Sequence, residues 1–596
     1  MIPYTAPLRD MRFALHEVIG LDRVSAIPAF ESATPDLVDA VLEEAGKLAS
    51  GVLAPLNTVG DKEGAKLANG VVRTATGWKD AYAQYRDGGW NSVPFEPEYG
   101  GQGLPFVVAT AVQEMWQAAN MAFALCPMLN QGAVEALTAH GSDEQKSTYL
   151  TKLISGEWTG TMNLTEPSAG SDVGAVRTKA VPDGDRWRIT GQKIFITYGE
   201  HDMADNIVHL VLARTPNAPA GTKGISLFIV PKFLVNADGS LGERNDLRCV
   251  SLEHKMGIHA SPTAVMAFGD NGGAIGYLVG EENRGMEYMF TMMNNARLGV
   301  GLQGVAIAER AYQQALAYAR SRIQSKSMAN PAGDSVAIIH HPDVRRMLLT
   351  MKAQIEAGRA LALYASAALD IGKHHEDPQQ RRLGQAMVDL LTPVVKAWCT
   401  DMGCEVSSIG VQIHGGMGFI EETGAAQHMR DARIAPIYEG TNGIQANDLA
   451  FRKVARDKGE AARTFIAEMR GLDAKLAAAP GDDLAAIRAA LSAGIDALDR
   501  ATDWVVANSR SDAQAVAASA AHYLRLFGIV AGGSMMARAA LAAQAGLGRG
   551  EDAAFYESKL ITCRFYADQI LPQAAGLAGV VTDGWRTVNA IAEDQF

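Results

Sequence analysis

The chain has 596 residues and a formal net charge of −12. It is therefore too long for a single hydrophobic core and too acidic for non-specific binding to nucleic acid or anionic membranes. Hydrophobic residues make up 48% of the chain, but no apolar run approaches the ~20 residues of a membrane span, so we expect no membrane insertion. The N-terminus has no apolar signal region, and the five cysteines are scattered without CxxC spacing. This pattern favours a reducing cytoplasm and predicts no metal site.

The first part of the chain is predicted to be mostly helical. Residues 1–34 form an N-terminal extension, in which the segment 9–20 predicts an amphipathic helix on the surface of the core. Residues 35–160 form an α-helical domain, which begins with Thr34 as N-cap and Pro35 as the first helical residue. Within this domain, the apolar run 106–125 predicts a buried helix after a loop rich in Pro and Gly.

Helical spacing then gives way to alternation, and we expect a β-domain over residues 161–281. In the segment 185–199, apolar residues alternate on either side of Gly191, as in a β-strand. The segments 206–215 and 223–232 are further short apolar-rich runs. The middle of the chain therefore differs in class from both ends.

Residues 282–460 return to helical spacing and are predicted to form an α-helical bundle. Residues 461–596 form an extra C-terminal α-helical domain, here called the tail. Asp482 and Asp483 follow the break Pro480-Gly481 and are placed to cap a helix. One apolar face of that helix contains Leu484, Ile487, Leu491, Ile495 and Leu498. The tail carries 12 Lys and Arg against 15 Asp and Glu, a net charge of −3, so it is not a basic nucleic-acid arm.

A single carboxylate, Glu439, stands before Gly440 and Thr441 in a short irregular stretch between two helical segments. Such a turn can present a reactive side chain together with a backbone N–H. The alternative is that Glu439 only caps the next helix, because acidic side chains favour helix N-termini. Taken alone, this stretch favours the capping interpretation.

Three motifs lie in the order helical, β, helical: Met162–Ala180 with TEPSAGSD, Lys193–Gly199 with KIFITYG, and Val411–Phe419 followed by Ile437–Gln445 with YEGTNGIQ. With them the chain resembles the acyl-CoA dehydrogenase family over about residues 35–455. The resemblance implies that family's fold, an α-helical domain, a β-barrel domain and an α-helical bundle, with an extra C-terminal α-helical domain here. The extension and the tail resemble a longer bacterial branch, which includes 3-methylmercaptopropionyl-CoA dehydrogenases.

The resemblance also implies FAD as the cofactor and assigns its contacts residue by residue. The residues expected to bind it are Met162, Leu164, Thr165, Gly170, Ser171, Phe195, Ile196, Thr197, Arg322, Gln324, Gln412, Gly415, Gly416, Thr441 and Asn442. Arg322 and Gln324 match a segment that reaches the FAD of a partner subunit. Phe195 stands where many members have Trp, which preserves stacking but removes an indole hydrogen bond.

By the same resemblance Glu439 is the catalytic base, and Ser171, Arg297, Tyr438 and Gly440 contact the acyl-CoA. Some members carry the base on another helix, but the corresponding segment 292–299 contains no Asp or Glu. The implied reaction converts an acyl-CoA to the trans-2,3-enoyl-CoA, with electron-transferring flavoprotein as electron acceptor.

Several alternatives remain open at this point. The substrate is either 3-methylmercaptopropionyl-CoA or a fatty acyl-CoA of β-oxidation. An acyl-CoA oxidase would share the extra helical domain, and a DNA-binding relative of the fold would require a more basic tail. For assembly we expect a homodimer in which the tail takes the position of a second dimer and contributes no FAD-binding or catalytic residue.

Overall fold

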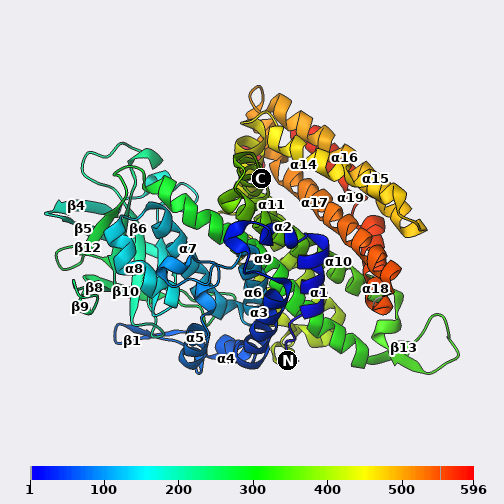
Figure 1. Ribbon diagram of the computed structural model, residues 1–596, viewed down its shortest axis with the longest axis horizontal. Coiled ribbons are helices and arrows are strands. Elements are labelled where there is room, and N and C mark those ends of the chain that lie inside the picture. The colour runs from blue at the N-terminus through cyan, green and yellow to red at the C-terminus, as the bar shows by residue number, and fades with distance from the viewer. Residues whose placement is uncertain (1–2, 551) are drawn as a thin grey trace. The chain divides into compact units, whose positions relative to one another are not determined.

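The computed structural model in Figure 1 describes residues 3–550 and 552–596. Contacts divide the chain into two compact units. The helical unit contains Met1–Glu43, Pro105–Glu114 and Val300–Phe596, and the sheet unit contains Glu44–Leu104 and Met115–Gly299. Three of the four points of division fall inside helices α3 (Pro35–Leu48), α6 (Phe106–Ala119) and α9 (Gly285–Ser321), and the fourth lies just before α6. The domain boundaries expected from the sequence stay a prediction.

The sheet unit is built around one curled, mostly antiparallel sheet of eight strands. Its order is β10-β11-β5-β12-β7-β6-β3, with β4 paired to β5, and only β3 and β6 run parallel in this sheet. The strands are β3 (Trp158–Asn163), β4 (Lys179–Asp183), β5 (Arg186–Thr197), β6 (Asn206–Ala213), β7 (Ser226–Pro231), β10 (Leu247–Leu252), β11 (Thr263–Phe268) and β12 (Ala274–Val279). Two small hairpins accompany it, β1 (Lys66–Ala68) with β2 (Val71–Arg73) and β8 (Phe233–Val235) with β9 (Leu241–Arg244).

Strand β5 turns the sheet at Gly191, the residue about which the sequence alternates. Before Gly191 the strand pairs with β4 and β12, and from Gly191 onward it pairs with β11. A Cβ at Gly191 would lie 2.5 Å from the Thr178 hydroxyl, so the crowded bend admits only glycine. The bend carries the second half of β5, which ends at Thr197, away from the first half.

Helices from earlier in the sequence belong to the same unit, and α7 and α8 among them pack on the sheet. These helices are η3 (Ala49–Leu53), α4 (Ala54–Glu63), α5 (Trp78–Asp87), α7 (Met121–His140) and α8 (Asp143–Ser155), with short turns at Trp90–Ser92 and Pro97–Tyr99. Helix α7 packs on β3, where Asn130 Oδ1 accepts a hydrogen bond from Gly160 N at 2.9 Å. A Cβ at Gly160 would lie 2.3 Å from that of Ala133, so the glycine permits this approach. The apolar run 106–125 is buried as predicted, but Asn120 divides it between α6 and α7 and caps α7 by accepting from Phe123 N.

The helical unit is organised around α9, α10 (Pro342–His374) and α11 (Pro378–His414). After the hairpin β13 (Ile323–Lys326) and β14 (Ser335–Ala337), α10 and α11 pack along their length. Arg359 of α10, 2% exposed, bonds Glu114 of α6 at 2.6 Å and Glu309 of α9 at 2.8 Å. Two buried carboxylates thus satisfy one buried guanidinium, which fixes α6, α9 and α10 to one another.

Backbones of α9 and α11 also come into direct contact. A Cβ at Gly304 would lie 2.0 Å from the carbonyl oxygen of Cys399, and one at Gly403 would lie 2.8 Å from Gly304. Small residues at both positions therefore allow the two helices to touch, and such close-packed interiors resist deformation. The elements that follow α11 are η9 (Gly415–Phe419), η10 (Glu421–Thr423), α12 (Ala425–Ala432), α13 (Asn442–Asn447) and η11 (Asp448–Ala455).

The tail forms a helical layer on this bundle, shown in yellow to red in Figure 1. It consists of α14 (Glu460–Arg470), α15 (Leu472–Ala478), α16 (Asp482–Asn508), α17 (Ala513–Arg549), α18 (Ala553–Gln569) and α19 (Gln573–Asp583). Helix α17 packs against α10, α11 and α13 as well as its own tail neighbours. The predicted apolar face of α16 is buried throughout. Asp482 and Asp483 occupy the first turn of α16 without making a side-chain cap, so the expectation that they cap it is wrong; Asp483 pairs with Arg564 instead.

Helix α17 is long and apolar enough to cross a membrane by length and composition, which the sequence analysis did not register. In the structure 83% of its most apolar window is buried inside the protein. A helix that is hydrophobic all round and enclosed by other helices is a core helix.

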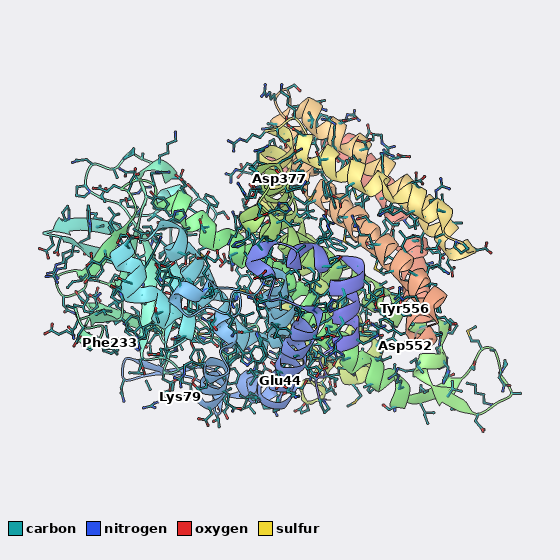
Figure 2. The ribbon with its side chains drawn as sticks, in the orientation of Figure 1. Glu44, Lys79, Phe233, Asp377, Asp552 and Tyr556 are labelled. Carbon is teal, nitrogen blue, oxygen red and sulfur yellow. The ribbon has the colours of Figure 1, made fainter. Side chains whose placement is uncertain are left out.

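The N-terminal segment packs its apolar face into the helical unit. It forms α1 (Leu8–Arg12) and a π-helical turn at Phe13–Val18, followed by α2 (Asp22–Ser25) and a short turn at Pro28–Phe30. Met11 and Leu15 are fully buried while Arg9, Arg12 and His16 are half-buried, which is the two-faced pattern expected of an amphipathic segment. Tyr556 of α18, labelled in Figure 2, donates to Glu17 at 3.0 Å, and Asp552 beside it pairs with Arg9 at 3.6 Å. The two ends of the chain therefore stabilise each other.

Candidate active site

Glu439 lies on a left-handed turn between α12 and α13. Its φ is +56° and that of Gly440 is +81°. A non-glycine residue in this region costs of order 1–3 kcal/mol and persists only where the surroundings enforce it. Thr441 caps α13 by accepting from Ile444 N at 3.3 Å. The alternative that Glu439 is the capping residue is therefore wrong.

Tyr438 precedes the carboxylate and is anchored to α9. Its hydroxyl donates to Oε1 of Gln303, a fully buried residue. Burial, and next the nearby Glu439 carboxylate, raise the pKa of the Tyr438 hydroxyl well above its usual value. Tyr438 therefore stays a neutral hydrogen-bond donor beside Glu439 at physiological pH.

Asn442 was expected to contact the cofactor, but its polar groups are engaged within the protein. Its side-chain N–H groups lie 2.7 Å from Asp401 Oδ1 and 3.0 Å from Thr400 Oγ1, and its Oδ1 accepts from Lys396 at 2.8 Å. Its backbone N–H donates to Pro436 O at 2.9 Å. These contacts favour a role in holding the turn over a direct role in binding FAD.

The loop TEPSAGSD of the sheet unit is held by a buried ion pair. Glu166, 5% exposed, accepts from Lys193 at 2.8 Å and from the backbone N–H groups of Arg177 and Thr178 at 2.7 and 3.0 Å. Lys193, fully buried on β5, also donates to Leu164 O at 3.1 Å. Burial lowers the pKa of Lys193 to about 8, so its ammonium group remains charged at pH 7. The pair links the first two sequence motifs, and the sequence analysis assigned neither residue a role.

The residues of the sheet unit that are predicted to bind FAD lie close to this ion pair in the sequence. Met162, Leu164, Thr165 and Thr197 are half-buried, Gly170 and Ser171 are exposed, and Ile196 is buried. Ile194 N donates to Thr165 O at 2.9 Å, which joins the loop to β5. Phe195 has a φ of +60° and is 58% exposed. An exposed aromatic ring held at a strained position is a feature of ligand sites.

The third motif begins at the C-terminal end of α11, in the helical unit. Gln412, Gly415 and Gly416 are exposed, and a Cβ at either glycine would meet no atom within 4 Å. The same holds at Gly170 in the loop of the sheet unit. Bare backbone facing open space can approach a ring or a phosphate closely, so these residues fit an FAD molecule.

Arg322 and Gln324 lie at the end of α9 and in β13. The Arg322 guanidinium donates to Gln324 Oε1 at 3.3 Å, and both side chains are exposed. Arg297, expected near CoA, is only 5% exposed, and its guanidinium carbon lies 5.8 Å from the centre of the Phe290 ring. This burial favours a packing role for Arg297 over a contact with a phosphate.

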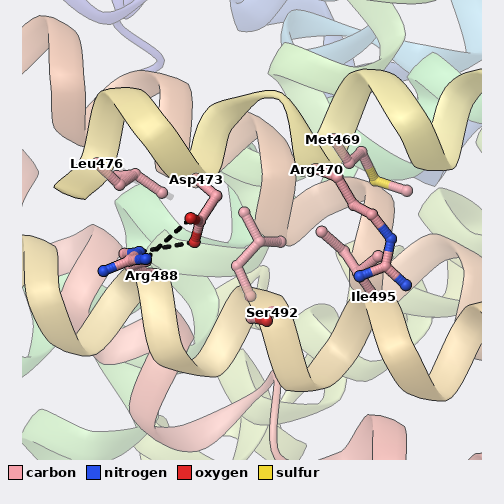
Figure 3. A pocket seen from close by; sticks show the side chains of 8 residues that line it. Met469, Arg470, Asp473, Leu476, Arg488, Ser492 and Ile495 are labelled. Atoms are coloured by element: carbon pink, nitrogen blue, oxygen red, sulfur yellow. Dashed lines mark hydrogen bonds and ion pairs between the residues drawn. The ribbon is translucent and has the colours of Figure 1, made fainter.

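The helical unit has a cavity within the tail and another between the tail and helices α10 and α11, and none of the predicted site residues lines either of them. The smaller, of about 220 Å³, lies between α14, α15 and α16. Figure 3 shows Asp473 and Arg488 paired across it, while Arg470 pairs with Asp496 and Asp499. The larger, of about 540 Å³, is polar and includes Asp401 in its wall. Neither brings together an acid, a base and a nucleophile.

Comparison with known proteins matches this arrangement throughout the chain. The models for the N-terminal, middle and C-terminal domains of acyl-CoA dehydrogenase match residues 51–157, 161–270 and 283–453. A model described as acetyl-CoA dehydrogenase C-terminal like matches residues 461–592. The chain therefore belongs to the acyl-CoA dehydrogenase family. It is a flavoprotein oxidoreductase that uses FAD and acts on acyl-CoA, as the family resemblance implied.

Individual members of the family are similar to this chain over nearly its whole length. A 3-methylmercaptopropionyl-CoA dehydrogenase of Ruegeria pomeroyi is 51% identical over 97% of this chain and 98% of its own. A butyryl-CoA dehydrogenase of Syntrophomonas wolfei is 37% identical over 96% of each chain. The solved structure of Caenorhabditis elegans ACDH-11 in complex with C11-CoA superposes with a TM-score of 0.77 over 98% of this chain and 97% of its own at 21% identity. The predicted fold, including the extra helical tail, is thereby confirmed.

Replacing Glu166 by Gln is expected to destabilise the flavin loop. The substitution leaves the Lys193 ammonium buried without its counter-charge, which typically costs about 3–5 kcal/mol. Thermal unfolding and the fraction of FAD retained after gel filtration measure the effect, with Asp183→Asn, which breaks an exposed pair with Arg188, as control. Equal behaviour of the two variants would show that the buried pair does not hold the loop.

Proposed function

We propose that Glu439 removes the α-proton of a bound acyl-CoA, which leads to the trans-2,3-enoyl-CoA. The observation that carries the proposal is the turn itself: Glu439 sits at a strained φ of +56° while Thr441 takes the capping role. A strained residue that is not needed as a cap is a candidate for chemistry.

The chemistry requires that a weak base deprotonate a very weak carbon acid. A free carboxylate with a pKa of ~4.3 is far too weak for this step. In the proposal, bound substrate excludes water from Glu439 and thereby raises its basicity. The backbone N–H of Glu439 donates to the thioester carbonyl and stabilises the negative charge that develops there. Tyr438 lines the acyl site beside Gly440.

FAD, when bound, supplies the acceptor for the hydride that leaves the β-carbon. Thr165, Ser171, Phe195 and Thr197 would contribute contacts to FAD, and Ser171 would also contact the acyl-CoA. Gln412, Gly415 and Gly416, at the end of α11, would also contribute contacts to FAD. Their exposure and the open space beside the glycines support these roles.

Glu439→Gln is expected to keep FAD but to slow flavin reduction by acyl-CoA. A general base contributes roughly 10² to 10⁴-fold or more, and the amide preserves size while removing basicity. Anaerobic stopped-flow bleaching of the flavin measures the rate. Glu422→Gln, an exposed carboxylate earlier in the same region, serves as control and should reduce at the normal rate. Bleaching of the Glu439→Gln variant at the wild-type rate would place the base elsewhere.

For the substrate we propose 3-methylmercaptopropionyl-CoA, supported by the 51% identity to the Ruegeria pomeroyi enzyme along almost the whole chain. The competing substrate class is a short fatty acyl-CoA, supported by the 37% identity to a butyryl-CoA dehydrogenase. A panel of both, assayed with a ferrocenium acceptor, should give the highest kcat/KM for the thioether. A preference for butyryl-CoA or a longer chain would reject this substrate.

We propose electron-transferring flavoprotein as the electron acceptor and the cytoplasm as the location. The alternative acceptor is oxygen, as in an acyl-CoA oxidase. Peroxide measured during aerobic turnover distinguishes the two, because a dehydrogenase should form little peroxide.

We also propose a homodimer in which Arg322 and Gln324 complete the FAD site of the partner. Apolar side chains are exposed beside them in the sequence and in the third motif: Ile323 is 60% exposed, Met328 79% and Phe419 86%. Large apolar side chains of this kind mark surfaces that a partner covers. The tail would take the place of a second dimer, since α17 already covers α10, α11 and α13.

Arg322→Ala is therefore expected to weaken dimerisation and FAD retention together, because one side chain serves both. Sedimentation velocity and the flavin-to-protein absorbance ratio measure the two effects, with the exposed Arg382→Ala as control. Native protein that sediments as a fully flavinylated monomer, or as a tetramer, would contradict the dimer.

A further inference from the structure

Lys396 is a fully buried lysine in the apolar middle of α11. Its ammonium group donates to the carbonyl oxygen of Gly440 at 2.9 Å and to Asn442 Oδ1 at 2.8 Å. Lysine is almost never fully buried unless its charge is bound. Here two of the acceptors belong to the turn that begins with Glu439.

The acceptors of Lys396 follow the catalytic carboxylate by one and three residues. Gly440 has a φ of +81° and continues the left-handed backbone of Glu439. The fully buried Gln445 adds a second donor, with Nε2 at 3.2 Å from both Glu439 O and Gly440 O. Backbone carbonyls that accept from buried donors cannot rotate freely, because rotation would leave the buried donors unsatisfied.

The same helix also fixes Asn442 from several sides. Asn442 Nδ2 donates to Ala397 O at 3.1 Å and to Thr400 Oγ1 at 3.0 Å, both within about one turn of Lys396. This part of α11 is held against α9 by the backbone contact at Gly304 and Cys399. Lys396 therefore extends from one of the least deformable parts of the helical unit.

We propose that Lys396 is a positioning residue for the catalytic base: its buried ammonium group fixes the Glu439 turn through the Gly440 carbonyl and the Asn442 side chain. The inference rests on the proposed function, in which Glu439 removes the α-proton. Lys396 touches neither substrate nor cofactor in this role. It acts by keeping the carboxylate in one geometry, and a displacement of about 1 Å at a reacting group can cost about 10²-fold in rate.

Lys396→Met tests the proposal because it keeps the length and removes the charge and its hydrogen bonds. Two rates should fall, on the order of 10²-fold: flavin reduction at saturating acyl-CoA, and α-hydrogen exchange of 3,3-dimethylbutanoyl-CoA in D₂O, followed by NMR. The second reports proton removal alone, since this thioester has no β-hydrogen to lose. FAD content and substrate affinity should change little. Wild-type exchange in this variant would overturn the proposal.

A double variant separates positioning from general damage. If Lys396 acts only through Glu439, adding Lys396→Met to Glu439→Gln should lower the residual exchange no further. A further fall of the same size as in the single variant would contradict the proposal. Lys559→Met is the matched control, since Lys559 is also buried in the helical unit but pairs with Asp10 and Glu356. It should lower the melting temperature without slowing exchange.

If Lys396→Met does not fold, Asn442→Ala tests the proposal instead. This substitution removes one of the two groups in the turn that accept hydrogen bonds from Lys396, and it keeps the ammonium group. Slower exchange at unchanged FAD content supports the proposal, and wild-type exchange overturns it. Normal exchange in Glu439→Gln would reject the proposed base itself. Loss of exchange in Glu439→Gln with normal exchange in both Lys396→Met and Asn442→Ala would reject only the role of Lys396.

Discussion

The direct contact between the backbones of α9 and α11 is the constraint on which the catalytic turn depends. It exists because Gly304 and Gly403 have no side chain to separate the helices. Near this contact, one side chain of each helix forms a hydrogen bond with a residue next to Glu439. Gln303 of α9 accepts from the Tyr438 hydroxyl, and Lys396 of α11 donates to Gly440 O. Glu439 stands between these two anchored residues, so the strain of its left-handed backbone is balanced by rigid packing on both sides.

Buried cations recur in this protein as a way of fixing irregular backbone. Lys193 binds the Leu164 carbonyl and the Glu166 carboxylate and so shapes the loop TEPSAGSD. Lys396 binds a carbonyl and an amide and shapes the Glu439 turn. Loops are normally mobile because their polar backbone faces water. A buried ammonium group with three donors removes that freedom, since each donor left unsatisfied would be costly.

The tail is joined to the rest of the helical unit by both apolar and charged contacts. Helix α17 supplies the apolar contact with α10, α11 and α13. Lys559 of α18, nearly fully buried, pairs with Glu356 of α10 at 2.9 Å and with Asp10 near the N-terminus. Breaking such a network leaves buried charges uncompensated. The extension and the tail, which distinguish this chain from shorter members of the family, are therefore energetically coupled.

The sequence by itself determined the class of each region, the order helical, β, helical, and the motifs that identify the family. These signals are local: period two around Gly191, the apolar face of α16, and glycines that follow a helix. Only the tertiary structure decided that Thr441 and not Glu439 caps α13, that the N-terminal segment bonds α18, and that Asn442 is engaged within the protein. Each of these depends on groups far apart in the chain. Lys396 and Glu439 are separated by 43 positions, and no local pattern shows that a lysine in an apolar helix will bind a distant carbonyl.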